Sequence, residues 1–473
     1  MAKGSAPCVK CYLAFALVVV IVLAATNVWN PFPGLWDWIN RSQPLADPDV
    51  TWQQRVGGTP QSVTITDRAV IVEHRTTVEG RSLVSGNQVW EHKADWAAVA
   101  GDGSEQVVVH GKLLVNGYQV TNPATGGLLR SDDEAVAVWT YRNALLDVRC
   151  ASPRDCTLTA WDPRGRTPRW SSNLPGIGFV VFADNPQLLG SRALETQDVA
   201  AGAGGPQTMP AVLGFPIDGR IHLVETRTGR ALQELEPEQH ERIVAVAGRV
   251  FSLVATPRDG ACYFNVQADD PVTGLRVWQR TGINLRTAER IGCAQRHDPT
   301  GGPNVLAGIA PDMRETVLDA HDGRVLWTGA AGQELLAVDD RYALVRSADG
   351  ETLQAYALPV PAVRWSRPIH ADAEAALTRH AAVLVDRKPD RVVALDPATG
   401  KELVNLRTSA EVLAVGPAGM VLGDGREIGY VRFTGVVTPT PTTAPAAPPD
   451  PDGDPNCGGP KQPECRPLPG KDG

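Results

Sequence analysis

A short pattern that recurs along the chain constrains its fold more than any other feature of the sequence. Its clearest copy is at 392–405, VVALDPATGKELVN, where an apolar run leads into Asp396 and Gly400 and a second extended run follows. Proline fixes φ near the value of a type I turn, Asp hydrogen-bonds the backbone two residues on, and Gly accepts the left-handed conformation. The pattern therefore predicts a hairpin turn between two strands.

Seven further segments repeat this order of strand, polar turn and second strand. The turn glycines are Gly86, Gly126, Gly165, Gly229, Gly274, Gly323 and Gly400, and one copy, LQAYALPVPAVRW, has lost its glycine. A tryptophan follows the turn in five copies, at Trp90, Trp170, Trp278, Trp327 and Trp365. A large apolar ring at a repeated position indicates packing between neighbouring repeats. Because the pattern occurs eight times, a structural role for Asp396 and Gly400 is favoured over a ligand-binding one.

The spacing of the repeat predicts the architecture. From Gly86 to Gly323, consecutive turn glycines are 40, 39, 64, 45 and 49 residues apart. A period of about 40–45 residues with short strands is typical of a β-propeller, in which each repeat forms a four-stranded blade. Glycine and proline together contribute 84 of the 473 residues, as expected of an all-β chain rich in turns. We expect a single propeller over 50–435 with eight blades, or seven as the alternative.

The two ends of the repeat region leave this blade count open. Trp52, in VTWQQRV, follows the N-terminal part of the chain and precedes the first copy of the turn pattern. Its strand could be a ninth outer strand, or it could close the ring by completing a blade that begins at 411–433.

The copies ALDPATGKELVN and VLDAHDGRVLW resemble the repeats of pyrroloquinoline-quinone-like β-propellers. This family includes eight-bladed quinoprotein dehydrogenases and the lipoprotein propeller of the outer-membrane β-barrel assembly machinery. The resemblance covers roughly 50–435 and is specific for the fold rather than for an activity. The dehydrogenases of the family hold a quinone and calcium with an adjacent cysteine pair, a stacking tryptophan, and Glu, Asn and Asp side chains. No adjacent cysteines occur here and none of these residues can be matched, so we expect no cofactor.

Other catalytic and metal-binding patterns are also missing from the sequence. It contains no GxSxG, GxxxxGK[ST] or HExxH motif, and its nine histidines are scattered without ligand spacing. The stretch 450–456, DPDGDPN, begins like a calcium-binding EF-hand loop. However, Pro455 and Lys461 occupy the positions where that loop needs Gly and Glu. We therefore predict no catalytic, cofactor-binding or metal residues, and no enzyme activity.

The N-terminal region predicts a membrane anchor. Residues 11–29, CYLAFALVVVIVLAATNVW, are almost wholly apolar, and Lys3 and Lys10 precede them. A run of about 18–20 apolar residues spans a bilayer as a helix, and the flanking charges keep the N-terminus in the cytoplasm. We expect a cytoplasmic stub at 1–11, a transmembrane helix at 12–29 and a juxtamembrane linker at 30–49. The rival interpretation is a cleaved signal peptide. Either way the propeller is exported, and the expected location is the plasma membrane with the propeller outside the cytoplasm.

Six of the eight cysteines follow the apolar run, in a compartment where disulfides persist. They are Cys150, Cys156, Cys262, Cys293, Cys457 and Cys465. The local pairs Cys150–Cys156 and Cys457–Cys465 are plausible and would leave Cys262 with Cys293, but six cysteines allow 15 connectivities. Cys8 and Cys11 precede the apolar run, and a lone CxxC does not complete a zinc site.

Three segments depart from the repeat. The glycine-rich stretch 191–215 is too long for a hairpin and is expected to protrude from one face, and 293–303 forms a loop tethered by Cys293. The tail, 436–473, is rich in Pro, Thr and Ala, and its composition is typical of a disordered segment.

These features favour a binding role in the cell envelope. The net charge is -8 and no dense Lys/Arg stripe occurs, which argues against a nucleic-acid partner. We expect a non-catalytic, monomeric propeller that binds an envelope protein or a cell-wall polymer through its loop-built faces. The alternative is a quinone-dependent oxidoreductase. A transmembrane sensor is disfavoured because the short cytoplasmic stub holds no signalling domain.

Overall fold

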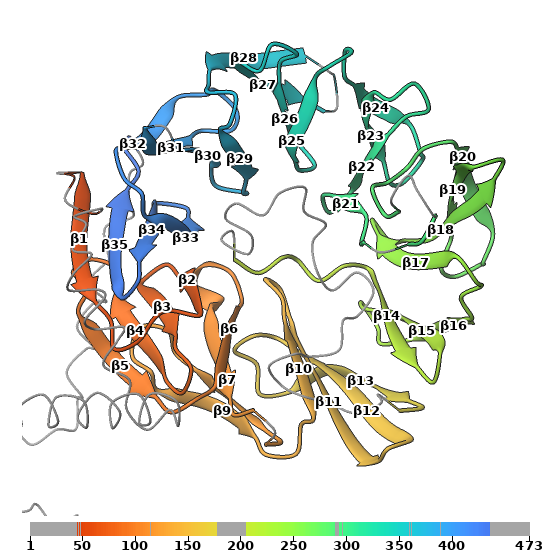
Figure 1. The fold of residues 1–473 in the computed structure, drawn as a ribbon. Coiled ribbons are helices and arrows are strands. Elements are labelled where there is room, and N and C mark those ends of the chain that lie inside the picture. The colour runs from red at the N-terminus through yellow and green to blue at the C-terminus, as the bar shows by residue number, and fades with distance from the viewer. Residues whose placement is uncertain are drawn as a thin grey trace, which may run out of the picture. The chain divides into compact units, whose positions relative to one another are not determined.

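The structure is a computed structural model that describes residues 45–435, except 46, 48, 114, 177–204, 289–292, 296, 359, 361 and 388. The described strands form nine antiparallel sheets, which we call blades 1 to 9, arranged around a ring (Figure 1). In the described part of the chain, no helix is long and apolar enough to cross a membrane. The predicted transmembrane segment, 12–29, and the predicted disordered tail, 436–473, lie outside the described residues.

Blades 1 to 4 are formed by consecutive strands. Blade 1 contains β2 (Ser62–Ile65), β3 (Ala69–Glu73), β4 (Val78–Ser82) and β5 (Gln88–His92). Blade 2 contains β6 (Trp96–Ala100), β7 (Val107–Gly111), β8 (Tyr118–Thr121) and β9 (Leu128–Asp132), with the short 3-10 helix η1 (Gly103–Glu105) between its first two strands. Blade 3 contains β10 (Ala137–Thr140), β11 (Leu145–Ser152), β12 (Asp155–Trp161) and β13 (Pro168–Leu174). Blade 4 has three described strands, β14 (Val212–Ile217), β15 (Arg220–Glu225) and β16 (Ala231–Leu235).

Blades 5 to 8 follow the same order. Blade 5 contains β17 (Glu241–Val246), β18 (Arg249–Arg258), β19 (Ala261–Asp269) and β20 (Arg276–Thr281). Blade 6 contains β21 (Thr300–Gly301), β22 (Val305–Ile309), β23 (Glu315–Asp319) and β24 (Val325–Thr328). Blade 7 contains β25 (Glu334–Val338), β26 (Tyr342–Arg346), β27 (Thr352–Ala357) and β28 (Ala362–Pro368). Blade 8 contains β29 (Glu374–Leu377), β30 (Ala382–Arg387), β31 (Asp390–Leu395) and β32 (Glu402–Leu406).

Blade 9 joins the two ends of the described chain and corrects the predicted blade count. Its strands β33 (Glu411–Gly416), β34 (Gly419–Asp424) and β35 (Glu427–Arg432) come from the C-terminal end, and its outer strand β1 (Val50–Arg55) comes from the N-terminal end. The described ring therefore has nine blades, and the predictions of eight or seven were wrong. Each of the eight turn copies belongs to one blade. The ninth blade lacks a copy because chain ends replace the turn before its outer strand.

Neighbouring blades contact each other through an aromatic side chain of the outer strand. The indole of Trp365 in blade 7 covers Gly400 of blade 8, where an added Cβ would lie 2.6 Å from Trp365 Cγ. The indole Nε1–H donates to the carbonyl of Pro397 in the same turn, at 2.9 Å. The same pair of contacts occurs for Trp52 with Gly86 and Leu83, Trp90 with Gly126 and Pro123, Trp170 with Gly229 and Thr226, and Trp278 with Gly323 and Ala320.

Between blades 2 and 3 an arginine takes the tryptophan position. The guanidinium carbon of Arg130 lies 4.2 Å from the ring centroid of Trp161, and Arg130 Nη1 donates to the carbonyl of Gly165 at 2.9 Å. Beneath them Asp147 is fully buried and accepts hydrogen bonds from Tyr118 Oη at 2.7 Å and Trp161 Nε1 at 2.9 Å. Burial raises the pKa of Asp147. This boundary is therefore held by a polar cluster rather than by an indole over a glycine.

Two further boundaries also depart from the repeat. Gln233 stands beside Gly274, with its Oε1 atom 3.3 Å from the position of an added Cβ. Trp327 packs on Tyr356 of blade 7, the blade whose turn lacks the glycine, with ring centroids 5.7 Å apart. At the boundary between blades 6 and 7, an aromatic pair thus replaces the contact between an indole and a turn glycine.

Six of the seven turn glycines adopt the left-handed conformation that the turn requires, with φ between 68° and 75°: Gly86, Gly126, Gly229, Gly274, Gly323 and Gly400. Gly165 does not have a positive φ. Its N–H donates to the carbonyl of Asp162 at 2.9 Å, which closes a tighter turn. In blade 8 the carboxylate of Asp396 accepts N–H bonds from Ala398 and Thr399. Asp396 and Gly400 therefore serve the turn itself.

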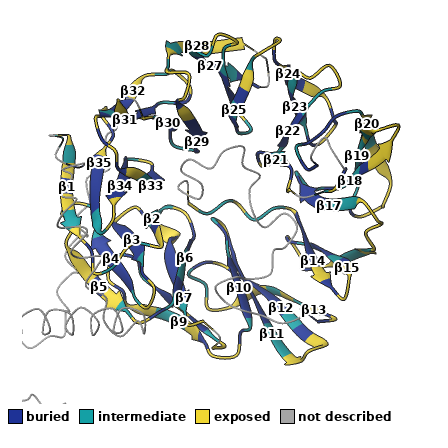
Figure 2. Cartoon of the chain, in the orientation of Figure 1, coloured by how far each residue is buried: buried dark blue, intermediate teal, exposed yellow. Residues whose placement is uncertain are grey.

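The alternation of antiparallel strands gives the ring two distinct faces. The turns between the first and second strands of a blade, which we call inner turns, lie at the same end as the turns between the third and fourth strands, which we call outer turns. We name this end the outer-turn face. The second–third turns and the blade-to-blade connections lie on the opposite face. Buried residues gather on the inner and middle strands, and exposed residues on outer strands such as β5 and β20 (Figure 2).

The contact between Trp365 and Gly400 leads to a stability prediction. Gly400→Ala should lower the free energy of unfolding by about 2–5 kcal/mol, because a left-handed alanine costs about 1–2 kcal/mol and overpacking adds about 1–3 kcal/mol. Gly260→Ala is the matched control, since Gly260 has φ 76° but no atom within 4 Å of an added Cβ. Chemical denaturation should show the larger loss only for Gly400→Ala. Equal losses would contradict the packing role of the indole.

Candidate functional site at the ring centre

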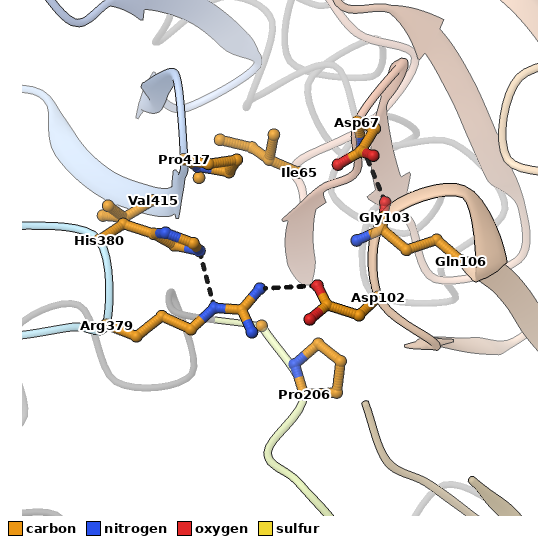
Figure 3. Close-up of a pocket in the computed structure, with 12 residues that line it drawn as sticks. Ile65, Asp67, Asp102, Gly103, Gln106, Pro206, Arg379, His380, Val415 and Pro417 are labelled. Atoms are coloured by element: carbon orange, nitrogen blue, oxygen red, sulfur yellow. Dashed lines mark hydrogen bonds and ion pairs between the residues drawn. The ribbon is translucent and has the colours of Figure 1, made fainter. Parts of the chain in front are cut away.

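A pocket of about 240 Å³ lies on the outer-turn face, where inner turns of four blades meet. Blades 1, 2, 8 and 9 and the segment before β14 line it, through Ile65, Asp67, Asp102, Gly103, Gln106, Gly205, Pro206, Arg379, His380, Val415, Gly416 and Pro417 (Figure 3). Ile65, Val415 and Pro417 form the apolar side of the pocket. Asp67, Asp102, Gln106, Arg379 and His380 form its polar side. The pocket therefore joins the blades on both sides of the split blade 9.

Asp102 is the centre of the ion pairs beside this pocket. Its carboxylate lies 3.4 Å from Nη2 of Arg379 in blade 8 and 3.8 Å from Nε of Arg142 in blade 3. Blades 9 and 1 separate blade 8 from blade 2 along the ring, so the Arg379–Asp102 pair spans both of them. The Asp102 side chain is 57% exposed, and such a pair contributes at most about 1 kcal/mol. The pair therefore orients the turns more than it stabilises the fold.

His380 is a titratable side chain that contacts Arg379. Arg379 Nε–H donates to His380 Nε2 at 2.8 Å, so the ring is neutral and carries its proton on Nδ1. Burial, followed by the positive charge of Arg379, lowers the pKa of His380 to about 4. Near neutral pH this imidazole is thus a hydrogen-bond partner for Arg379, held in one tautomer, rather than a charged group.

The segment before β14 crosses the middle of the ring in Figure 1. Gly205 and Pro206 line the pocket, and the carbonyl of Gln207 accepts the Arg142 N–H at 2.7 Å. The Arg142 guanidinium also donates to Thr208 Oγ1, and Met209 N–H donates to Asn143 Oδ1 at 2.8 Å. The described end of the predicted 191–215 loop is thus held against the inner turn of blade 3, while 191–204 lies outside the described residues.

None of the tryptophans, turn glycines or cysteines singled out from the sequence lines this pocket, whereas the predicted 191–215 loop reaches it through Gly205 and Pro206. The tryptophans and turn glycines lie at blade boundaries. The described cysteines form two disulfides, Cys150–Cys156 within one hairpin and Cys262–Cys293 between blade 5 and the 293–303 loop. Cys457 and Cys465 lie outside the described residues. Arg379 and His380 belong to the short turn TRHA, which carries no motif, so only the closing of the ring brings them beside Asp102.

Two observations concern the quinone and calcium ligands that the resemblance to quinoproteins implies. In the described ranges, no group of three or more His, Cys, Asp or Glu side chains is placed to hold a metal ion. The four described cysteines are all in disulfides between residues that are not adjacent in the sequence. We therefore assign no residue to a quinone or to calcium.

Comparison with known proteins supports the type of repeat. Residues 263–411 match the model of a family described as outer membrane protein assembly factor BamB. These residues include blades 6 to 8, and this part of the chain is therefore similar to β-propeller repeats of the pyrroloquinoline-quinone-like type. No curated protein matches the chain.

Solved propellers resemble the chain only remotely. BamB from Moraxella catarrhalis is 14% identical over 81% of this chain and 99% of its own, with a TM-score of 0.33. A quinohemoprotein alcohol dehydrogenase from Pseudomonas putida is 12% identical over 85% and 78%, with a TM-score of 0.36. The C-terminal WD40 domain of Sif2 is 11% identical over 82% and 99%, with a TM-score of 0.37. Likenesses at this level carry no argument about function.

The lowered pKa values of two buried histidines predict how the stability of the fold depends on pH. Burial, followed by the charge of His92, lowers the pKa of His110 to about 4 from 6.5, as burial does for His380. Between pH 6.5 and 4 these two histidines bind more protons in the unfolded chain than in the folded one, so their contribution to stability is lost as the pH falls through this range. His110 contributes at most roughly 3 kcal/mol to this loss.

Thermal melts of wild type and His110→Gln from pH 7 to pH 4 measure this effect. The variant should lose less stability over the range, whatever its stability at pH 7. A wild-type slope in the variant would show that His110 does not titrate as its burial requires.

Proposed function

We propose that the chain is a non-catalytic scaffold of the cell envelope. In this proposal residues 12–29 anchor the chain in the plasma membrane, and the propeller outside the cytoplasm binds a partner protein or a cell-wall polymer. The observation that carries it is the ring centre, where Asp102, Arg379 and Arg142 are engaged with each other and His380 is neutral. This arrangement favours a rigid disc over a site that presents a nucleophile or a proton donor. The matched family is described as an assembly factor, which also supports a binding role.

A braced hairpin of blade 5 is the best candidate for the partner-binding surface. The hairpin consists of the last residues of β18, Ala255–Arg258, which pair with the first residues of β19, Ala261–Phe264. The strands β17 and β20 pair only with the remaining residues of β18 and β19. An isolated two-stranded hairpin is only marginally stable. Here Cys293 and Ala288 pack against one side, and the Cys262–Cys293 disulfide fastens them.

The other side of this hairpin is open. Tyr263 is 51% exposed, and the Arg258 guanidinium carbon lies 5.8 Å from its ring centroid. Tyrosine and arginine are enriched among the residues that dominate protein interfaces. A surface that is rigid before binding loses little conformational entropy on association. These contacts support protein recognition by the hairpin.

Affinity capture of the full chain from cross-linked envelopes tests the proposal. Wild type should retain a specific partner that the double variant Arg258→Ser, Tyr263→Ser loses, while Met313→Ser, an exposed change on the same face, should retain it. The same captures should be assayed by absorption after addition of quinone and calcium. Quinone binding at micromolar concentration with substrate turnover, and no partner lost by the hairpin variant, would favour the oxidoreductase alternative.

A further inference from the structure

Exposed apolar side chains gather at one end of the blades. Of the thirteen large apolar residues that are exposed in the described part of the chain, nine lie in an outer turn or in the first two residues of the strand that follows it. They are Val84, Val89, Leu128, Val272, Leu275, Val277, Val325, Val360 and Val363. Single exposed apolar residues are ordinary. Their repetition at equivalent positions of blades 1, 2, 5, 6 and 7 puts them on the rim of one face.

Cationic side chains share the same rim. Exposed arginines or lysines occur in or beside the outer turns of blades 3 to 8: Arg166, Arg227, Arg230, Arg276, Arg324, Arg364 and Lys401. In blades 5 to 7 they stand directly beside the exposed aliphatic residues, as in Leu275–Arg276 and Arg324–Val325. Amphipathic helices that lie at the boundary between lipid headgroups and acyl chains combine apolar residues with Arg or Lys in the same way.

Some acids of these turns bond the turn backbone, while Glu225 lies 3.7 Å from Arg227 and 3.8 Å from Arg230, and Asp319 lies 3.7 Å from Arg324. Asp270 accepts N–H bonds from Val272 at 3.0 Å and Thr273 at 2.9 Å, and these bonds lower the pKa of Asp270. Asp396 accepts the corresponding bonds in blade 8. The carboxylates of Asp270 and Asp396 are thus partly compensated by turn N–H groups, and no ion pair is assigned to Arg166, Arg276, Arg364 or Lys401 among the described residues.

The start of β1 and the end of β35 lie on this same face. Val50, at the start of β1, pairs with Val431 near the end of β35. Phe433 N–H then donates to the carbonyl of Ala418, in the inner turn of blade 9. Leu45 is 2% exposed and lies beside Gly429 of β35, where an added Cβ would be 3.3 Å from Leu45 Cδ1. The 16 residues from 29 to 45 reach at most about 55 Å.

We propose that the outer-turn face lies on the surface of the bilayer, with its rim of Val and Leu side chains at the headgroup boundary and its Arg and Lys side chains on lipid phosphates. The proposal rests on the anchor at 12–29 assigned under the proposed function. The anchor makes docking intramolecular, so a few shallow apolar contacts suffice. The blade 5 hairpin, on the opposite face, then points away from the membrane toward its partner.

Site-specific fluorescence in vesicles tests this orientation. The full chain is reconstituted in phosphatidylcholine:phosphatidylglycerol vesicles, with a polarity-sensitive fluorescent amino acid in place of Leu275, or in place of Met313 on the opposite face as the matched control. Lipids brominated on their acyl chains should quench the probe at 275 about twofold or more and leave the probe at 313 unchanged. Val360→Ser with Val363→Ser should weaken the quenching at 275, and Leu113→Ser with Val115→Ser, on the opposite face, should not.

Equal quenching at the two positions, or none at 275, would overturn the proposed orientation. An alkaline carbonate wash examines the anchor separately, because a chain with a membrane-spanning helix stays with the vesicles. Release by the wash with quenching at 275 counts against the anchor and still supports docking of this face. Retention without quenching at 275 supports the anchor and overturns the docking.

Discussion

The fold depends on one contact, an indole laid over a glycine of the next blade. The glycine must lack a Cβ because Trp ring atoms already occupy that space, at 2.6 Å for Trp365 and Gly400. It must also have positive φ because its turn starts the outer strand. One residue thus satisfies a backbone requirement and a packing requirement, and the indole N–H adds a hydrogen bond to the same turn. This contact is repeated at five of the blade boundaries, where it sets the spacing between neighbouring blades.

The seam of the ring is built from the same contact. Trp52 on β1 covers Gly86 of blade 1 as the other tryptophans cover their glycines, although its strand joins blade 9 from the far end of the chain. The pocket, the Arg379–Asp102 pair, the start of β1 and the end of β35 lie on the same face at or near this seam. The pocket and the point where the ring closes therefore coincide.

Much of this architecture could be predicted from particular residues. The turn chemistry of Asp396 and Gly400 and the recurrence of tryptophan identified the propeller and most of its outer turns, because local backbone requirements leave local signatures. The blade count was wrong because blade 9 has no turn copy and its outer strand is far away in sequence. Arg130 at a tryptophan position was missed for a similar reason, since only the fold places it over Trp161.

The sequence by itself determined the repeat, the turn conformations and the all-β class, since each depends on residues a few positions apart. Only the tertiary structure decided the number of blades and which residues share a face. Asp102 and Arg379 are 277 residues apart and meet because the ring closes. The grouping of exposed Val, Leu, Arg and Lys side chains on the outer-turn face likewise follows from strand alternation in nine sheets, which turns a scattered sequence pattern into one rim.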